Sequence, residues 1–275
     1  MVMPKKGEKM EMKLTSSPWG FRFYNFENYC AFLKKIGITG ICVFFADPKE
    51  LLLAFGDNMS DEDIKKIKAV VAKNGQSIFE VCGGGDYTVK TRINEEIEKT
   101  KKHIDLSVKL GAKIFRVFGG WIKEEEATDE TYEQISESLT QIGKYAKKYN
   151  ITIAMENHGG VTRTAKQVVR IMKKVKADNV GVNYDPANFQ FHNEDAYRAL
   201  LEIKEYIVFT HIKSCKKIGD KMHYCRLNEG TIDYKPIFAE LNKFYEGYWT
   251  LEYEEPKDVE AGTIDDLKIL KSMLE

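Results

Sequence analysis

The stretch TIAMENHGG at positions 152–160 is a short apolar segment that ends in polar residues and two glycines. VGVNYDPAN at 180–188 repeats this arrangement, and IVFTHIK at 207–213 and WTLEYEE at 249–255 repeat it again. Each segment is nearly continuous in hydrophobic residues up to its first charged or imidazole side chain. Such runs are typical of parallel strands that are buried on both faces. The four segments therefore predict part of a parallel sheet.

Outward from these segments, short apolar stretches alternate with longer amphipathic ones along the chain. We expect strands at 13–16, 40–45, 77–82, 114–118, 152–156, 180–184, 207–212 and 249–253. We expect helices at 61–74, 93–110, 131–149, 165–175, 195–204, 234–244 and 265–274. Ser60 with Asp63 predicts a helix start, and Gly111 predicts a helix end. The alternation predicts an α/β fold, a (β/α)8 TIM barrel, as a single domain over residues 1–275.

The composition and charge of the chain argue against some classes of binding partner. Lysine plus arginine and aspartate plus glutamate both number 42, so the chain lacks the positive charge of a nucleic-acid binder. Five scattered cysteines without a CxxC pair favour reduced thiols in a cytoplasmic protein. The start MVMPKKGEKM is polar and does not resemble a signal peptide, and no run has the length of a membrane span. We expect a cytoplasmic protein with no nucleic-acid or membrane partner.

Four polar residues stand where four successive strands end. In a parallel barrel, functional groups lie at the carboxyl ends of the strands, and Glu156, Asp185, His211 and Glu252 occupy these positions. Three carboxylates and an imidazole in a buried mouth would repel one another and be costly to desolvate, which a divalent cation would relieve. Three oxygens and one nitrogen suit Mn2+, Mg2+ or Co2+, and Zn2+ remains possible. We predict one divalent metal ion, with Mn2+ first among these.

Further polar residues near the strand ends are candidates for substrate contact. His158 lies two residues beyond Glu156, and its alternative role is packing within the loop. Lys213 shares a strand face with His211 and would stabilise an oxyanion or pair with Glu156 or Glu252. Arg116 on the fourth strand would bind substrate or orient Glu156.

The segment 214–231 is expected to be a loop that covers the pocket. It contains Arg226, which would hold a substrate oxygen or be a surface charge. Trp19, Phe45 and Trp121 follow early strands and would form an apolar wall for the C–H face of a sugar or pack in the core.

Several motifs resemble the sugar phosphate isomerase/epimerase superfamily, also called xylose isomerase-like TIM barrels. They are GAKIFRV at 111–117, MENH at 155–158, DPAN at 185–188, HIK at 211–213 and NEGTIDY at 228–234. The resemblance extends from the segment at 37–41 to the strand that carries Glu252. Members of the superfamily include ketose 3-epimerases, hydroxypyruvate isomerase, inosose dehydratase and a type of 3-dehydroshikimate dehydratase.

The resemblance implies that Glu156, Asp185, His211 and Glu252 are the metal ligands. In the epimerases, the glutamates on the fifth and eighth strands also move protons on opposite faces of the substrate, and the metal stabilises an enediolate. Glu156 and Glu252 inherit these catalytic roles. The implied activity is that of a metal-dependent isomerase or epimerase of a small sugar or sugar-like polyhydroxy carbonyl compound.

Two positions depart from the epimerase pattern. The loop at 157–162 has no second acid, and Asn188, a candidate substrate contact, stands where the epimerases have a histidine, although His192 is near. His158 is then a candidate catalytic acid or base. The alternative function is a metal-dependent dehydratase, a lyase of the inosose or 3-dehydroshikimate type.

Two other classes fit the sequence less well. An abasic-site endonuclease on this fold needs several histidine ligands, whereas His211 is the one histidine of five that stands at a clear ligand position. A non-catalytic sugar-binding subunit would not need all four ligand residues. We also consider a homo-oligomer possible.

Overall fold

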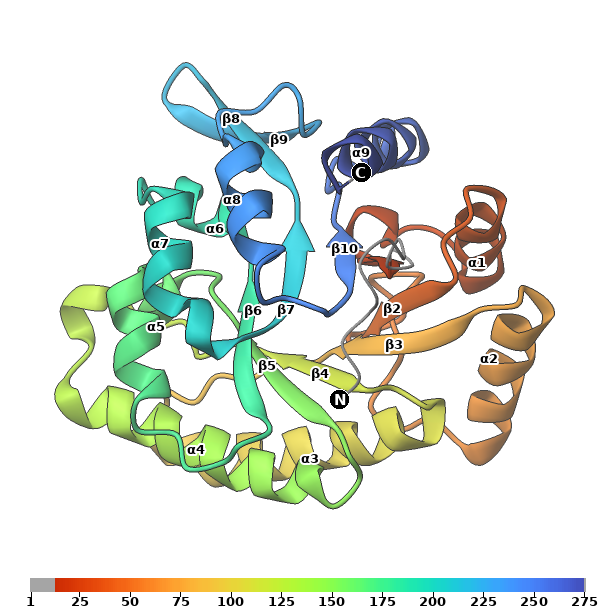
Figure 1. The fold of residues 1–275 in the computed structure, drawn as a ribbon. Coiled ribbons are helices and arrows are strands. Elements are labelled where there is room, and N and C mark those ends of the chain that lie inside the picture. Colours follow the sequence, from red (N-terminus) through yellow and green to blue (C-terminus); the bar gives the residue numbers. More distant parts are fainter. Residues whose placement is uncertain (1–12, 275) are drawn as a thin grey trace.

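Eight short parallel strands close into a barrel in the computed structural model, which describes residues 13–274 (Figure 1). The barrel strands follow the order β1-β10-β7-β6-β5-β4-β3-β2, and β1 closes the ring by pairing with both β10 and β2. Their bounds are β1 Leu14–Ser16, β2 Gly40–Phe44, β3 Ser77–Cys82, β4 Ile114–Val117, β5 Thr152–Glu156, β6 Val180–Tyr184, β7 Ile207–Ile212 and β10 Trp249–Leu251. The predicted (β/α)8 barrel is confirmed.

The predicted strand bounds agree closely with the structure, apart from the strand ends. The strands predicted at 77–82, 152–156, 180–184 and 207–212 have the predicted limits. Those predicted at 40–45, 114–118 and 249–253 end one or two residues earlier, and the first begins at Leu14. Phe45 leaves the β2 ladder because it pairs with Phe55 in the following loop. Residues at these ends therefore turn into the mouth of the barrel.

Helices connect the strands and cover the outside of the barrel. They are α1 Phe26–Lys35, α2 Asp61–Lys73, α3 Ile93–Leu110, α4 Asp129–Lys147, α5 Ala165–Met172, α6 Pro186–Phe191, α7 Ala196–Ile203, α8 Tyr234–Leu241 and α9 Val259–Leu274. Ser60 and Asp63 form the predicted capping box, and Gly111 ends α3 at a φ of 91°. The helix predicted at 131–149 begins earlier because Thr128 caps it. The short helix α6 was not predicted.

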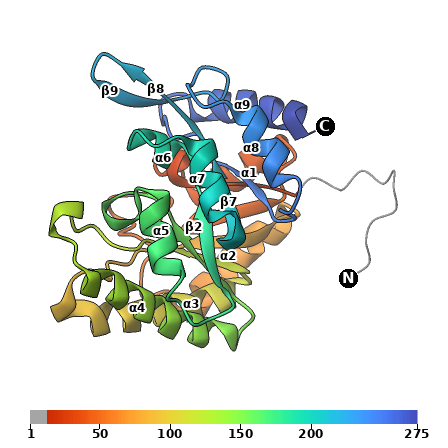
Figure 2. The same ribbon diagram turned by 60° about the vertical axis from the view of Figure 1, so that its left-hand side comes forward.

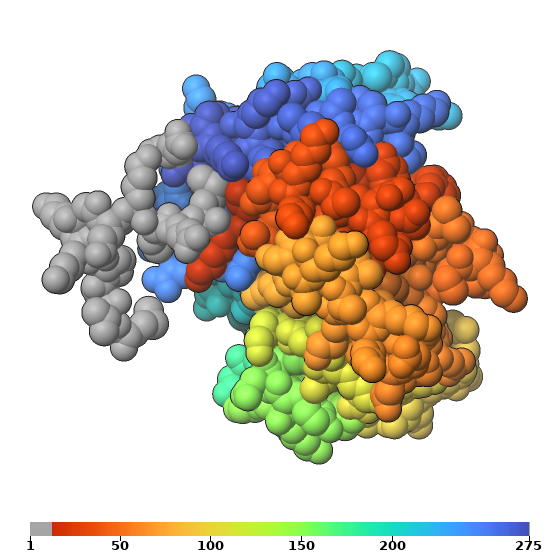
Figure 3. All heavy atoms as spheres, turned by 90° about the vertical axis from the view of Figure 1, so that its right-hand side faces the viewer, coloured from red at the N-terminus to blue at the C-terminus, as the bar shows by residue number. Residues whose placement is uncertain are grey.

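The segment 214–231 is more ordered than the predicted loop. It contains the antiparallel hairpin of β8 Ser214–Ile218 and β9 Lys221–Cys225, which stands off the barrel near α6 (Figure 2). Its turn has Gly219 at a φ of 60° and Asp220 as the two central residues. In Figure 3 the red first strand and helix lie between the blue end of the chain and the orange segment around α2, as the barrel order requires.

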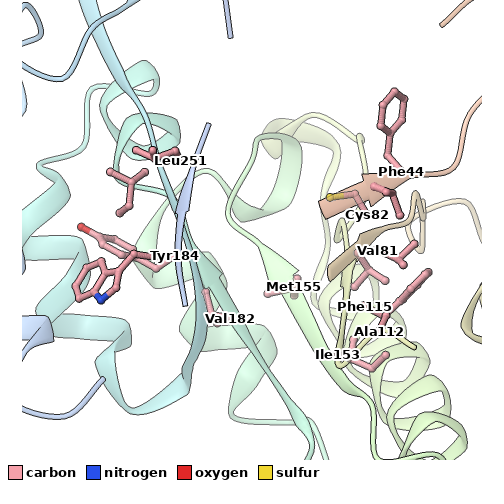
Figure 4. Packing of buried hydrophobic residues seen from close by; sticks show 14 of the residues in the cluster. Phe44, Val81, Cys82, Ala112, Phe115, Ile153, Met155, Val182, Tyr184 and Leu251 are labelled. Carbon is pink, nitrogen blue, oxygen red and sulfur yellow. The ribbon is translucent and has the colours of Figure 1, made fainter. Parts of the chain in front are cut away.

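Two apolar clusters support the barrel from outside and inside. Side chains such as Phe115, Ile153 and Val182 point outward into the layer between strands and helices (Figure 4). Because successive strand residues point to opposite sides, the alternate positions face the barrel axis. Four of these, Cys42, Ile114, Ala154 and Phe209, form a separate buried cluster that fills the lower barrel.

The inner cluster determines where the charged residues lie. Two residues beyond Ile114, Ala154 and Phe209, the same strands carry Arg116, Glu156 and His211. Each charged group therefore lies directly above an apolar side chain, in the mouth at the carboxyl ends of the strands. A dry floor below the charges strengthens the electrostatic interactions among them.

Within residues 13–274, no helix combines the length and the apolar composition that crossing a membrane requires. The segment 1–12, which includes the stretch judged unlike a signal peptide, lies outside the described residues. The cysteines are buried, free thiols.

The inner cluster yields a test of the fold. We expect Phe209→Ala to lower the free energy of unfolding by about 3–5 kcal/mol, because it leaves a void under the mouth. The same substitution at Phe244, which is 40% exposed, should cost less than about 1 kcal/mol. Urea denaturation of the two variants measures both values, and equal costs would contradict the role of the inner cluster.

Candidate metal centre and active site

Glu156, Asp185, His211 and Glu252 converge in the barrel mouth. Each offers one ligand atom, and these atoms all lie within 4.8 Å of one another. All four side chains are buried. They come from the ends of β5, β6, β7 and β10, which are neighbours in the barrel order. The structure thus brings together the four residues that the sequence predicts as ligands.

A reciprocal pair of hydrogen bonds holds the ends of β5 and β6 together. The Asn157 side-chain amide donates to the Asp185 carbonyl oxygen at 2.8 Å, and the Asp185 backbone N–H donates to Asn157 Oδ1 at 2.8 Å. Asp185 Oδ1 also accepts from the backbone N–H groups of Ala187 and Asn188, which caps α6. These contacts fix the second oxygen, Oδ2, toward the site. Within residues 13–274, Oδ2 has no hydrogen-bond partner and lies 3.0 Å from Lys213 Nζ.

Glu80 orients the imidazole of His211. His211 Nε2 lies 3.3 Å from both carboxylate oxygens of Glu80, a fully buried residue on β3. The other ring nitrogen, Nδ1, then faces Glu252 Oε1 at 3.1 Å and Glu156 Oε1 at 3.6 Å. A carboxylate behind a ligand histidine is a common way to fix its orientation and its tautomer. Sequence analysis missed Glu80, although one acid in the strand SIFEVC marks an unusual buried position.

Glu156 is held by two neighbours that the sequence had suggested as substrate contacts. Arg116 Nε lies 3.2 Å from Glu156 Oε2, and Asn188 Nδ2 donates to Glu156 Oε1 at 3.1 Å. Arg116 also donates to the Gly83 carbonyl oxygen, and its guanidinium lies 4.0 Å from the ring centre of Phe118. Arg116 and Asn188 therefore set the position of the Glu156 carboxylate.

Lys213 connects the other carboxylates of the mouth. Its buried Nζ lies 3.0 Å from Asp185, 2.9 Å from Glu252 and 2.5 Å from Glu254. Glu252 additionally accepts a hydrogen bond from Ser17 Oγ at 2.5 Å. Glu254 shares the inward face of its segment with Glu252, two residues before it, and sequence analysis did not single it out.

The crowding of charges shifts the pKa of all four candidate ligands. Burial opposes ionisation of Glu156, but Arg116 and His211 outweigh it and lower its pKa to about 2. His211 and Lys213 likewise hold the pKa of Glu252 well below its usual value. Burial raises the pKa of Asp185 to about 7 despite Lys213, and the acidic neighbours raise the pKa of His211 well above its ordinary value. The mouth thus favours a positive charge at the point where these four groups meet.

The donor set fits a divalent cation. Asp185 Oδ2 and His211 Nδ1 are buried and, within the described residues, without a hydrogen-bond partner, and both face the other two carboxylates. A cation would satisfy both atoms at once. Glu80, Cys82 and His211 form a second possible ligand group, but it uses the opposite nitrogen of the same histidine. Burial raises the pKa of the Cys82 thiol, so it is a poor ligand there.

A cavity of about 550 Å3 opens above these residues. Its walls carry Glu156, Lys213, Glu252, Arg116 and Glu254, together with the His158 ring. This is the volume of a pocket for a small molecule. The wall also includes aromatic side chains: Trp19, Phe44, Phe45, Phe118, Trp121 and Tyr224.

His158 reaches the cavity as predicted, in a mainly aromatic setting. Its ring contacts Phe118 and Trp121 edge-on, with centroid separations of 4.9 and 5.4 Å. Burial lowers its pKa to about 4, so the imidazole is neutral at neutral pH. Its buried Nδ1 has no hydrogen-bond partner within residues 13–274. A neutral ring in this position can accept a proton or donate its N–H.

Arg226 does not reach the cavity. Its guanidinium donates to Asp258 at 2.8 Å and to Asp265 at 3.0 Å, away from the residues that line the mouth. The hairpin that precedes it contributes Tyr224 to the cavity wall instead. The structure therefore gives Arg226 an ion-pair role between the hairpin and α9, which is closer to the predicted surface charge than to the predicted substrate contact.

Comparison with known proteins gives a consistent result. The family model described as xylose isomerase-like TIM barrel matches residues 30–273. An inosose dehydratase of Glaesserella parasuis serovar 5 (strain SH0165) is 26% identical over 211 residues, which cover 64% of this chain and 70% of that protein.

Solved structures with the same fold share less sequence. The IOLI protein with a bound zinc atom has a TM-score of 0.78 at 19% identity and covers 96% of this chain and 98% of its own. A D-psicose 3-epimerase with D-tagatose from Clostridium cellulolyticum H10 has a TM-score of 0.76 at 17% identity, with coverage of 96% and 100%. At these identities the likeness concerns the fold.

Glu80 provides a test of the metal centre. We expect Glu80→Gln to weaken the binding of Mn2+ or Zn2+ by about 10- to 100-fold, because the His211 ring loses its charged partner. Glu95→Gln, on the exposed side of α3, is the matched control and should bind as the unmodified chain does. Isothermal titration calorimetry measures both, and unchanged affinity in Glu80→Gln would argue against the orienting role.

The pKa shifts predict how ion binding depends on pH. Because the pKa of Asp185 is raised to about 7 and that of His211 is also raised, a cation must displace protons from these groups. The apparent affinity should therefore fall as pH decreases from about 8 to about 6, by up to about tenfold per pH unit for each displaced proton. Calorimetry in buffers of different ionisation enthalpy counts the released protons, and Asp185→Asn should release fewer. Pure pH-independence would contradict the assigned ligand set.

Proposed function

We propose that this chain, which belongs to the xylose isomerase-like TIM barrel family, is a divalent-metal-dependent isomerase or epimerase of a small polyhydroxylated carbonyl compound. The observation that carries the proposal is the convergence of Glu156, Asp185, His211 and Glu252 below an open cavity. A structural metal site would be closed, whereas this one faces a space of substrate size.

Glu156, Asp185, His211 and Glu252 would hold the ion, for which we favour Mn2+ over Mg2+, Co2+ and Zn2+. When bound, the cation would supply Lewis-acid stabilisation for negative charge on the carbonyl and hydroxyl oxygens of the substrate. Asp185 and His211 would be the most firmly positioned ligands. A backbone N–H group of α6 holds the Asp185 carboxylate, and Glu80 holds the His211 imidazole.

Glu156 and Glu252 would move the proton. Both are held as carboxylates, by Arg116 and by His211 with Lys213, so each can accept a proton from a carbon next to a carbonyl group. They stand on β5 and β10, which are separated in the barrel by β6 and β7. Both lie in one half of the cavity but at the two ends of the ligand group, so they would approach the reacting carbon from two directions.

Lys213, Arg116 and Asn188 would control charge around the reacting carbon. The Lys213 ammonium stays paired with Glu252 and Glu254, and its positive charge would offset negative charge that develops on a nearby substrate oxygen. Arg116 and Asn188 keep the Glu156 carboxylate in place.

We propose the cytoplasm as the compartment of this protein, because its cysteines are free thiols.

A dehydratase is the second candidate, and two observations favour it. The inosose dehydratase relative is one, and the other is the absence of a second acid in the loop 157–162, where His158 borders the cavity. The reaction would begin with the same proton transfer from carbon to Glu156 or Glu252. The carbon–oxygen bond of the β-hydroxyl group would then break, and the proton taken from carbon would pass to the departing oxygen, which leaves as water. The neutral His158 ring would hydrogen-bond this oxygen and could relay the proton by accepting it on one nitrogen.

Substrate incubation in D2O separates the two functions. With metal-loaded protein and a panel of ketoses and cyclitol ketones, incorporation of deuterium without an enone absorbance indicates isomerisation or epimerisation. Growth of the enone absorbance indicates dehydration. Neither signal on the whole panel would count against both functions.

The roles of the two glutamates predict a further result. We expect Glu156→Gln and Glu252→Gln each to slow proton exchange by at least about 100-fold, because an amide cannot act as the base. Glu125→Gln, in an exposed segment after β4, is the control and should exchange normally. Metal content measured on the same samples separates loss of the base from loss of the ion. Normal exchange in both variants would refute the assignment.

A further inference from the structure

The positive charges of the cavity are already paired. Among the described residues that line it, the basic side chains are Arg116 and Lys213. Lys213 contacts three carboxylates, and Arg116 contacts Glu156 and the Gly83 carbonyl oxygen. Neither cation is available to an incoming anion without breaking a buried ion pair, and breaking such a pair is costly.

The total charge of the mouth is not positive even with an ion present. The buried carboxylates are those of Glu80, Glu156, Asp185, Glu252 and Glu254. With all five ionised, Arg116, Lys213 and one divalent cation, with His211 as a neutral ligand, leave one negative charge in excess. Burial raises the pKa of Glu254 to about 7, and a proton on Glu254 would make the sum zero. In either state, a phosphate or carboxylate group on a substrate meets no net attraction.

The usual phosphate position of this fold is acidic here. TIM barrels often bind phosphate in the loops after the seventh and eighth strands, at a helix N-terminus. After β10 this chain has Glu252, Glu254 and, further on, Asp258. The helix after β7, α8, has Asp233 as its N-cap residue, whose carboxylate accepts a hydrogen bond from the Lys235 backbone N–H, so this helix start also carries an acid.

The cavity has a charged half and an aromatic half. The charged half is formed by β5, β6, β7 and β10, whereas Trp19, Phe44, Phe118 and Trp121 lie on β2 or in the segments that follow β1 and β4. Arg116 on β4 is the charged exception on the aromatic side, and Tyr224 of the hairpin, whose ring lies beside Lys213, is the aromatic exception on the charged side. A molecule between the two halves has its oxygens toward one and its C–H face toward the other.

Two tryptophans of the aromatic half remain open to solvent. Trp19 is 42% exposed and rests edge-on against Phe44, and Trp121 is 48% exposed and contacts Phe118. Large exposed aromatic side chains at the rim of a cavity are typical of a ligand-binding groove. Their faces suit the C–H side of a polyhydroxylated ring, which is apolar although the hydroxyl groups around it are not.

We propose that the substrate is an uncharged polyhydroxylated ketone or aldehyde, neither phosphorylated nor carboxylated, whose C–H face lies against Trp19 and Trp121. This inference rests on the proposed function, because that function makes the cavity the substrate site. It selects the neutral sugars and cyclitol ketones from a superfamily whose members also act on anions.

Binding to matched pairs of ligands tests the proposal. The pairs are inosose with 3-dehydroshikimate, both cyclic ketones, and fructose with fructose 6-phosphate. We expect the neutral member of each pair to quench tryptophan fluorescence of the metal-loaded protein and to bind at least about tenfold more tightly than the anion. Equal or tighter binding of the anions, or no binding of either neutral ligand, would overturn the proposal.

Variants separate charge from stacking. Glu254→Gln removes one carboxylate from Lys213, so it should strengthen anion binding and reduce the ratio of neutral-ligand affinity to anion affinity. Glu255→Gln, whose side chain is outside the cavity lining, is the control and should leave this ratio unchanged. Trp121→Leu should weaken the neutral ligand by about tenfold in calorimetry. An unchanged preference in Glu254→Gln would refute the electrostatic explanation, and unchanged affinity in Trp121→Leu would refute the stacking.

The outcomes also distinguish this inference from the proposed function. Protein that binds the neutral ketones but neither exchanges their α-protons nor releases water would refute the function and leave the binding inference intact. Turnover of a phosphorylated or carboxylated ketone in preference to its neutral partner would support the function and refute the inference.

Discussion

Burial of like charges in a small space is the constraint on which this molecule depends. Strand geometry places carboxylates above an apolar floor, where each would be unstable alone. Lys213, Arg116 and His211 compensate for part of that charge, and a cation would compensate for more. The same set of contacts explains the shifted pKa values, the position of each ligand atom and the unsuitability of the cavity for anions. Stability and chemistry here have a common electrostatic origin.

Much of the barrel follows from local patterns. The strands β3, β5, β6 and β7 are apolar runs with sharp polar ends, so their limits and the residues at their ends are visible in the sequence. The limits of α4 and α9 are less visible, because a threonine cap and a mixed first turn obscure where each helix begins. The hairpin β8–β9 did have a signal, the Gly219-Asp220 turn between alternating residues, that a reading of 214–231 as a loop overlooked.

A site residue was predictable where its position at a strand end is enough to identify it. It was not predictable where its role depends on a contact with a residue far away in the sequence. Glu156, Asp185, His211 and Glu252 follow from strand ends alone. Arg226 is held by acids 32 and 39 positions away, and no local pattern reveals them. Glu80 is 131 positions from the histidine that it contacts, so its importance emerges only when the barrel closes.

The division of the cavity into two halves has a consequence for how such a protein can change over generations. The half that carries the candidate metal ligands is interlocked through Asn157, Asp185 and Lys213, so most substitutions there disturb several contacts at once. The aromatic half is formed mainly by the loops after β1, β2 and β4. Its side chains contact one another, as Trp19 contacts Phe44 and Trp121 contacts Phe118. Loops on the aromatic side can therefore be replaced while the candidate metal ligands on the other side are inherited unchanged.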